Sequence, residues 1–156
     1  MKFLALITII ASLFSQAVLA ADSHKLMIKE PIIRATAPNA GATAGYLTIH
    51  NHSQTDDRLI AVKAEFARKS EIHEMKMVGD VMKMRPIEGG IIIPAGGMAL
   101  LEKGGNHLMF MGLTEQIQFK DTYQFTLVFE KAGEIRVNAD TISLSGKSHD
   151  QKGHKH

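Results

Sequence analysis

The sequence predicts an all-β domain, and two observations carry the prediction. Short runs of β-branched and apolar residues recur along the chain, each bounded by Gly, Asn, Asp or Pro. No window of adequate length has a clean helical period with capping residues at its ends. Many short strands at this spacing are typical of a β-sandwich or a β-barrel.

The strand pattern can be followed in order along the chain. Strands are expected at residues 26–35, 44–51, 58–65, 70–77, 81–87, 90–93, 98–101, 107–112, 124–130 and 134–142. Turn residues separate them at 38–41, 79–80, 94–97, 104–106 and 132–133. We find no internal repeat, so the strands form one domain.

The N-terminus has the pattern of a secretory signal peptide. Lys2 provides a positive charge, residues 3–13 form an apolar stretch, and Val18-Leu19-Ala20 ends in small residues at the two positions that a signal peptidase reads. We expect residues 1–20 to be removed and the mature chain to be periplasmic. The alternative is a retained membrane anchor, for which the apolar stretch is short.

The mature chain divides into a β-domain at residues 21–145 and a tail at 146–156. The full chain has a formal charge of +2 and no basic block, so nucleic acid is not an expected partner. No second long apolar run follows, so we expect no stable membrane insertion after cleavage. The chain contains no cysteine and therefore no disulfide. We expect a monomer.

The tail reads GKSHDQKGHKH and has no apolar residue, so we expect it to be disordered. It carries His149, His154 and His156, which form a candidate Cu(II) site; the alternative is a solvated tail without a ligand. Cleavage after Ala21 instead would make His24 the third residue, a position at which histidine binds Cu(II) with the amine and two backbone amides.

Histidine and methionine concentrate in one part of the chain. Seven of the nine methionines lie between Met75 and Met111, together with His73 and His107. Imidazole and thioether ligands without a thiolate suit copper, and Cu(I) above all. We therefore consider this region a candidate copper site.

Strand parity places part of this group on one face of a hairpin. Alternation puts His73, Met75 and Met77 on the same side. Gly79-Asp80 is a two-residue turn signal with Gly first, as a type II′ turn requires. Pairing across it sets Met75 opposite Met84 and Met77 opposite Met82, so His73 and Met84 are diagonal neighbours.

A later segment repeats the arrangement. His107 and Met109 are two residues apart and share a face with Met111, whereas Leu108 and Phe110 face the other way as candidate core residues. If this strand approaches the hairpin, two histidines and two methionines can meet around one ion.

Packing is the competing interpretation for each methionine, because methionine commonly fills irregular cores. Five of them remain open between packing and a supporting role near the site. They are Met75, Met77, Met82, Met98 and Met111.

The motifs of the mature chain resemble the PCuAC family of periplasmic copper chaperones. The matching segments are 34–38 (RATAP), 45–49 (GYLTI), 71–74 (EIHE), 82–86 (MKMRP), 93–97 (IPAGG) and 107–113 (HLMFMGL). The family motif begins with a His, which is followed after ten residues by a Met. About twenty-one residues later it ends in His-x-Met. Here the gap between Met84 and His107 holds twenty-two residues, and we expect the extra one at Gly89-Gly90, away from the ligands.

The resemblance implies a cupredoxin-like Greek-key β-sandwich that binds Cu(I) through His73, Met84, His107 and Met109. It implies delivery of copper to the copper centres of cytochrome oxidase, directly or through a partner protein. Some relatives carry a His- and Met-rich C-terminal extension that helps take up Cu(II), and the tail here fits that pattern in histidine but contains no Met.

Other functions are weighed against this one. Blue-copper electron transfer is disfavoured because its ligand set needs a cysteine. The sequence has no Ser-His-Asp or HExxH signature, so we expect no enzymatic activity; a copper-dependent periplasmic enzyme is the less favoured alternative. Copper storage or resistance, and a plain interaction module with a methionine face, are the remaining alternatives.

Overall fold

The computed structural model describes residues 25–143, and the segments predicted as a signal peptide and a tail lie outside this range. Ten strands follow one another in it: β1 (Leu26–Arg34), β2 (Ala42–Asn51), β3 (Asp57–Ala64), β4 (Ala67–Val78), β5 (Val81–Pro86), β6 (Ile91–Ile93), β7 (Met98–Leu101), β8 (His107–Leu113), β9 (Thr122–Phe129) and β10 (Gly133–Ile142). All ten predicted strands are confirmed, and their ends differ from the prediction by at most three residues, at the start of β4.

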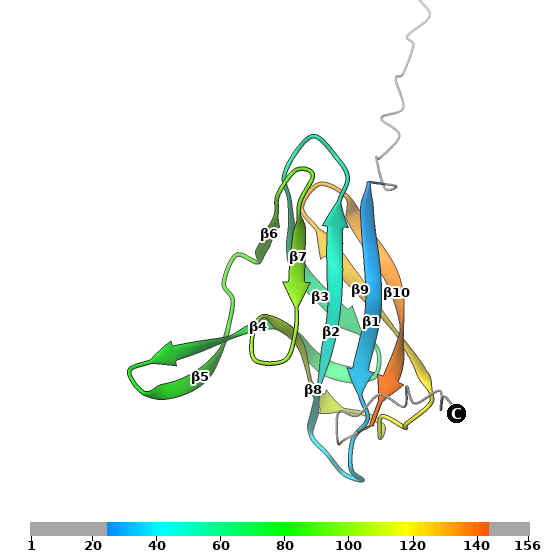
Figure 1. The fold of residues 1–156 in the computed structure, drawn as a ribbon. Coiled ribbons are helices and arrows are strands. Elements are labelled where there is room, and N and C mark those ends of the chain that lie inside the picture. The colour runs from blue at the N-terminus through cyan, green and yellow to red at the C-terminus, as the bar shows by residue number, and fades with distance from the viewer. Residues whose placement is uncertain (1–24, 144–156) are drawn as a thin grey trace, which may run out of the picture.

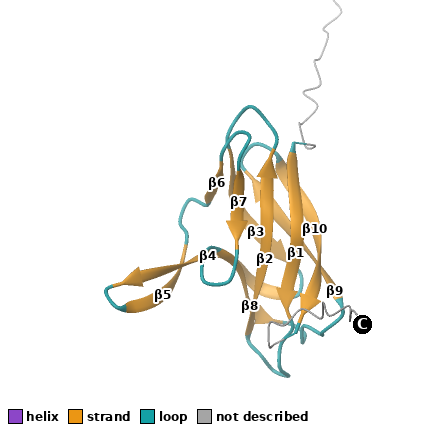
Figure 2. Ribbon diagram, in the orientation of Figure 1, coloured by secondary structure: helices purple, strands orange, loops and turns teal. Residues whose placement is uncertain are grey.

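The described residues contain strands and loops but no helix, as Figure 2 shows. Within this range there is consequently no helix that could cross a membrane.

The strands form one hydrogen-bonded path, β5-β4-β8-β2-β1-β10-β9-β3-β6, and β7 joins it by pairing with β2. The path folds over on itself, so that β1, β2 and β7 pass in front of β3 and β9 (Figure 1). β1 and β10 are parallel, whereas every other pair is antiparallel. The predicted β-sandwich is therefore confirmed.

Alternating side chains of the strands fill the space between the layers. Along β2, Leu47 and Ile49 are buried, whereas Tyr46, Thr48 and His50 lie on the outer face. Phe110 of β8 is fully buried and packs with Phe66 and Phe125 at ring-centroid distances of 5.0 and 5.5 Å. As predicted, Leu108 and Phe110 are core residues, which leaves the other face of β8 free for other side chains.

The end of β4 and all of β5 form a hairpin that projects from the sandwich (Figure 1). In the described part of the chain, β5 pairs only with β4 and ends the path. We call residues 75–86 the arm and the rest of the described chain the body. Every residue of β5 is exposed, so the arm has solvent on both faces over most of its length.

The loop after the arm returns the chain to the body. Gly90 has a φ of 79°, and a Cβ there would clash with the carbonyl oxygen of Leu59 in β3. Only glycine fits this close approach, which fixes where the arm leaves the sandwich. The pair Gly89-Gly90 lies in a loop against β3, away from the histidines, as the sequence predicts for this segment.

Candidate metal centre

The two histidines of the motif face each other across a strand pair. β4 pairs with β8 in a register that sets His73 directly opposite His107. Their ring centroids are 5.9 Å apart and the rings meet edge to face. Both residues are buried, with exposed fractions of 8% and 5%. The condition left open by the sequence, that β8 approaches the hairpin, is therefore met.

The hydrogen bond of His107 fixes which of its nitrogens is free. Its Nδ1 lies 3.0 Å from the carbonyl oxygen of Gly105. A carbonyl only accepts, so Nδ1 carries the hydrogen and donates it. In the neutral ring, Nε2 then keeps its lone pair. Histidines that bind metals characteristically hold the second ring nitrogen in this way.

His73 has the reverse arrangement. Its Nε2 lies 2.9 Å from Oε2 of Glu71 and donates to that carboxylate. Its Nδ1 is buried and has no hydrogen-bond partner, the one such buried side-chain atom in the described residues. A buried polar atom without a partner is costly, so it calls for a ligand that the protein itself does not provide.

Glu71 is held in its ionised form. A hydrogen bond from Lys69, at 2.7 Å, lowers the pKa of the Glu71 carboxyl below its ordinary value, and the bond from His73 lowers it further. An ionised carboxylate accepts hydrogen only, which keeps the hydrogen of His73 on Nε2. The Nδ1 lone pair is thereby kept available.

The two methionines of the motif flank this pair of rings. In the hairpin, Met75 lies opposite Met84 and His73 lies opposite Pro86, so Met84 is the diagonal neighbour of His73 predicted from the turn. Gly79 has a φ of 64° and Asp80 does not have a positive φ, as a type II′ turn requires. Met109 is half-buried, two residues from His107 on the same face, and opposite Glu71.

The exposure of the two thioethers differs from that of the rings. Met84 is 48% exposed on the arm, whereas Met109 lies half-buried on the body. The structure thus brings His73 and His107 together in the body, with Met109 beside them and Met84 at the solvent side. The four side chains come from β4, β5 and β8.

The remaining predicted residues fall in different places. Met77 lies opposite Met82 on the arm, as predicted, and both are about half exposed. Met98 lies in another ladder, opposite His50, and is 58% exposed. His24, His149, His154 and His156 lie outside the described residues.

Sequence reasoning missed two side chains next to the rings. Glu71 is two residues before His73, so strand parity alone could have placed it on the same face. Tyr46 lies in β2, and its ring centroid is 6.5 Å from that of His107. Its position depends on the pairing of β2 with β8, for which no local signal exists.

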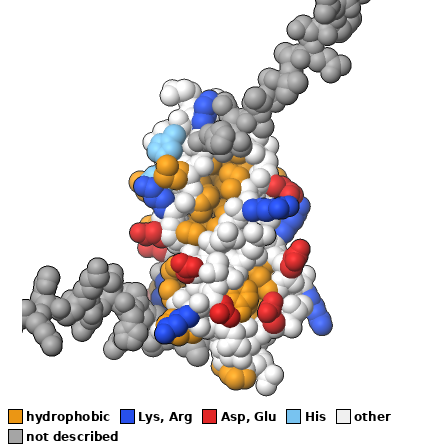
Figure 3. All heavy atoms as spheres, turned by 90° about the vertical axis from the view of Figure 1, so that its right-hand side faces the viewer, with side chains coloured by type: hydrophobic (Ala, Val, Ile, Leu, Met, Phe, Trp, Pro, Cys, Tyr) orange, Lys and Arg blue, Asp and Glu red, His pale blue; other side chains and the backbone are white. Residues whose placement is uncertain are grey.

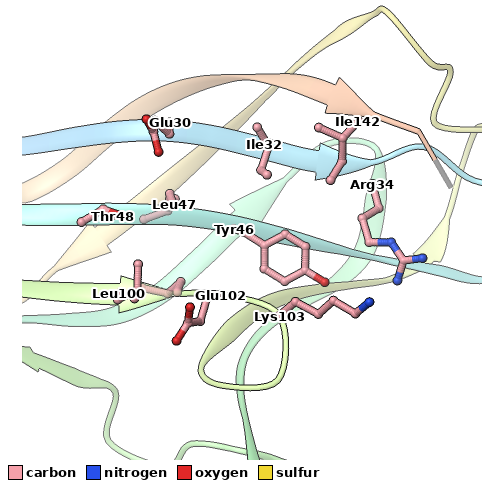
Figure 4. A pocket seen from close by; sticks show the side chains of 11 residues that line it. Glu30, Ile32, Arg34, Tyr46, Leu47, Thr48, Leu100, Glu102, Lys103 and Ile142 are labelled. Atoms are coloured by element: carbon pink, nitrogen blue, oxygen red, sulfur yellow. The ribbon is translucent and has the colours of Figure 1, made fainter. Parts of the chain in front are cut away.

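A groove of about 380 Å³ runs over the outer face of β1 and β2 and reaches Tyr46. Figure 4 shows the Tyr46 ring between Ile32 on one side and Glu102 and Lys103 on the other. The groove meets the candidate centre only at Tyr46, since none of the four ligand candidates lines it. It is open to solvent and contains charged side chains of both signs.

The ligand candidates also limit the kind of metal. Among the described residues, no group of three or more His, Cys, Asp or Glu could hold an ion by itself. Met84 and Met109 are the neighbouring side chains that could complete the coordination of an ion at His73 and His107. This combination suits Cu(I) and not Zn²⁺, whose sites use Cys, His and carboxylates.

A scan against family models matches residues 26–141 to the family described as "Putative lipoprotein LpqE-like". The match covers nearly all of the described chain. This chain belongs to the LpqE-like family. A relative in sequence is "Putative lipoprotein Lxx21020" of Leifsonia xyli subsp. xyli (strain CTCB07). It is 26% identical over 117 residues, which cover 75% of this chain and 70% of that one.

Solved structures similar to this LpqE-like chain are PCuAC domains. The apo PCuAC domain from PmoF1 is 28% identical with a TM-score of 0.64, covering 76% of this chain and 94% of that one. The copper-bound PCuAC domain from PmoF2 is 26% identical with a TM-score of 0.64, covering 76% and 93%. CuI-DR1885 from Deinococcus radiodurans is 27% identical with a TM-score of 0.54, covering 74% and 75%.

These comparisons confirm the resemblance to the PCuAC family that the sequence motifs indicated. They also confirm the cupredoxin-like fold that the resemblance implied.

Proposed function

We propose that this LpqE-like protein is a copper metallochaperone that carries Cu(I) as its cargo. The ion binds Nδ1 of His73, Nε2 of His107 and the sulfurs of Met84 and Met109. One observation carries the proposal: the buried Nδ1 of His73 has no hydrogen-bond partner, and it belongs to a ring that faces a second imidazole with a free nitrogen.

The ring separation suits a shared ion. A metal–imidazole bond is about 2 Å long, so an ion between two rings holds their centroids roughly 5 to 6 Å apart. The observed 5.9 Å lies within this span. Glu71 and Gly105 hold the other ring nitrogens, so each imidazole keeps one nitrogen for the ion.

The ligand set also favours release. Thioether does not titrate and binds Cu(I) without a negative charge, so the ion is held by neutral ligands. Met84 is half exposed on the arm, where an acceptor can reach it before the buried histidines. A cysteine-bearing acceptor could then replace the ligands one at a time. A carrier needs this property, whereas a storage site or an enzyme does not.

The relatives support a copper carrier. A copper-bound PCuAC domain of PmoF2 and the CuI form of DR1885 share more than 25% identity and the fold with this chain. By analogy with the PCuAC family, the acceptor belongs to the assembly of the copper centres of cytochrome oxidase. A signal peptide cleaved after Ala20 would deliver the chain to the periplasm, consistent with a family described as lipoproteins.

Copper storage or resistance is the second candidate. The specific observation in its favour is the His-rich tail at residues 146–156, which could take up Cu(II) through His149, His154 and His156. A storage protein keeps its copper when an acceptor is added, whereas a chaperone loses it. Transfer from the loaded protein to a soluble domain of cytochrome oxidase that contains its copper-binding cysteines separates the two.

The proposed site is tested by anaerobic titration of the mature protein with Cu(I) against a chromophoric Cu(I) chelator. Met84→Leu should weaken the tightest site, whereas Met77→Leu, on the same face of the same hairpin and also about half exposed, should leave it unchanged. His73→Asn should abolish this site.

X-ray absorption of the protein loaded with one equivalent of Cu(I) should give two sulfur and two nitrogen neighbours. Nitrogen and oxygen neighbours alone would contradict the proposal.

A further inference from the structure

A second group of histidines and methionines lies at the far end of β2, outside the centre described above. His50 of β2 is directly opposite Met27 of β1 on one side and Met98 of β7 on the other. Residues directly opposite in neighbouring strands point to the same face and have Cβ atoms about 5 Å apart. The three side chains therefore form a row across three strands.

A second imidazole adjoins the row. His52 follows His50 by two residues, and their rings are stacked with centroids 6.1 Å apart and an interplanar angle of 8°. His50 is half-buried and His52 is exposed. Two imidazoles and two thioethers thus meet on one patch of surface, the same ligand types as in the candidate centre.

Packing does not explain these methionines. Met27 is 47% exposed and Met98 is 58% exposed, and the neighbouring Ile49 and Ala99 point into the core instead. Figure 3 shows histidine side chains beside hydrophobic ones on this part of the surface. Two half-exposed thioethers beside two imidazoles contribute little to the core, and their sulfurs are accessible to a ligand from solvent.

We infer that Met27, His50, His52 and Met98 form a second Cu(I) site. Neutral imidazole and thioether ligands select a soft, singly charged ion. Lys29 lies opposite Thr48 on the same face as Met27. A positive charge on this face opposes a divalent cation more strongly than a monovalent one.

This second site is expected to bind more weakly than the first. His50 is half-buried and His52 is exposed, and within the described residues no hydrogen bond holds either ring, whereas Glu71 and Gly105 hold the rings of the first site. The second site is also separate from the first. Tyr46, which contacts His107, is four residues before His50 on the same face of β2, about 14 Å along the strand. One ion cannot bridge the two groups.

The test uses the mature protein labelled with ¹³C in its methionine methyl groups and titrated anaerobically with Cu(I) alone. The methyl signals are assigned by single Met→Leu variants. The first equivalent should move the signals of Met84 and Met109, and the second should move those of Met27 and Met98. In the double variant His50→Asn, His52→Asn, the second change should be lost while the first is retained. Met77, which lies on the arm and not in the row of Met27, His50 and Met98, serves as the control that should not move with the second equivalent.

The inference is overturned if the Met27 and Met98 signals stay in place up to two equivalents of Cu(I), for example because the second ion binds the tail. It is also overturned if they move equally in the double histidine variant. The proposed function is tested separately, because it fails when Met84 and Met109 do not move, whatever happens at Met27 and Met98.

Discussion

The two ends of β4 show how one strand can serve two purposes. Its first half lies in the body, where Ala67, Ile72 and His73 are buried. Its last residues belong to the arm, where Met77 and Val78 are 54% and 47% exposed. The same strand is therefore buried on both faces around Ile72 and His73 and exposed to solvent at its other end.

The difference teaches that strand parity assigns side chains to a face but does not say whether anything covers that face. In the body, β8 and the second layer cover β4. In the arm, only β5 accompanies it, and an isolated two-stranded hairpin is marginally stable in water. The proposed copper centre lies at the boundary between the two regions, with buried imidazoles from the body and an exposed thioether from the arm.

The largest contrast between the regions is expected in folding stability. Phe110→Ala removes a fully buried ring that packs with Phe66 and Phe125, and should cost about 3–5 kcal/mol of unfolding free energy. Val81→Ala at the tip of the arm, where the side chain is 58% exposed, should cost less than about 0.5 kcal/mol. Urea denaturation of both variants measures the difference. Similar losses would mean that the arm folds as part of the core.

Local signals in the sequence were sufficient to predict the strands and the register of the arm. The ten strands could be predicted because each is a short run with its own boundary residues. The register of the arm could be predicted because a two-residue turn fixes which residues are opposite each other. Both signals are local, so they need no knowledge of the rest of the fold.

The surroundings of the histidines could not be predicted in the same way. The pairing of His73 with His107 and the approach of Tyr46 depend on β4, β8 and β2 lying side by side, and these strands are far apart in the sequence. The row of Met27, His50 and Met98 was missed for the same reason. Each of its members comes from a different strand, and the one local signal was His52, two residues after His50.

A smaller effect on the free energy of unfolding is expected from replacing the buried imidazole of His73. His73→Leu removes the Nδ1 that has no partner, while Glu71 keeps its bond to Lys69. The free energy of unfolding of the copper-free protein should therefore stay the same or rise by up to about 1 kcal/mol, because a polar atom left unsatisfied by the fold is replaced with an apolar group. Denaturation with and without Cu(I) provides the measurement.

In the same variant, the increase in unfolding temperature that one equivalent of Cu(I) gives the wild-type protein should become much smaller, because a ligand stabilises the native state according to its affinity and only the weaker site remains. Ile72→Val, a mild change at the adjacent buried position, is the control that should keep this increase. A copper-free His73→Leu protein that is less stable by more than about 1 kcal/mol would show that the ring serves the fold of the body.

The smallest effect is expected from the surface of the body. Lys63 in β3 and Glu134 in β10 form an exposed ion pair at 2.6 Å, and the hydrogen bond from Lys63 lowers the pKa of the Glu134 carboxyl below its ordinary value of 4.5. A lowered pKa means that the folded state favours the ionised form. The pair therefore stabilises the protein at pH values above that ordinary pKa, and its contribution is lost as the pH falls through the folded pKa.

Glu134→Gln should lower the urea midpoint slightly at neutral pH, because exposed pairs contribute little. It should not lower the midpoint at all in acid well below the folded pKa. A difference between the variant and the wild type that stays constant across this range would show that the side chain acts through packing, and the stability of the body would then owe nothing to this charge.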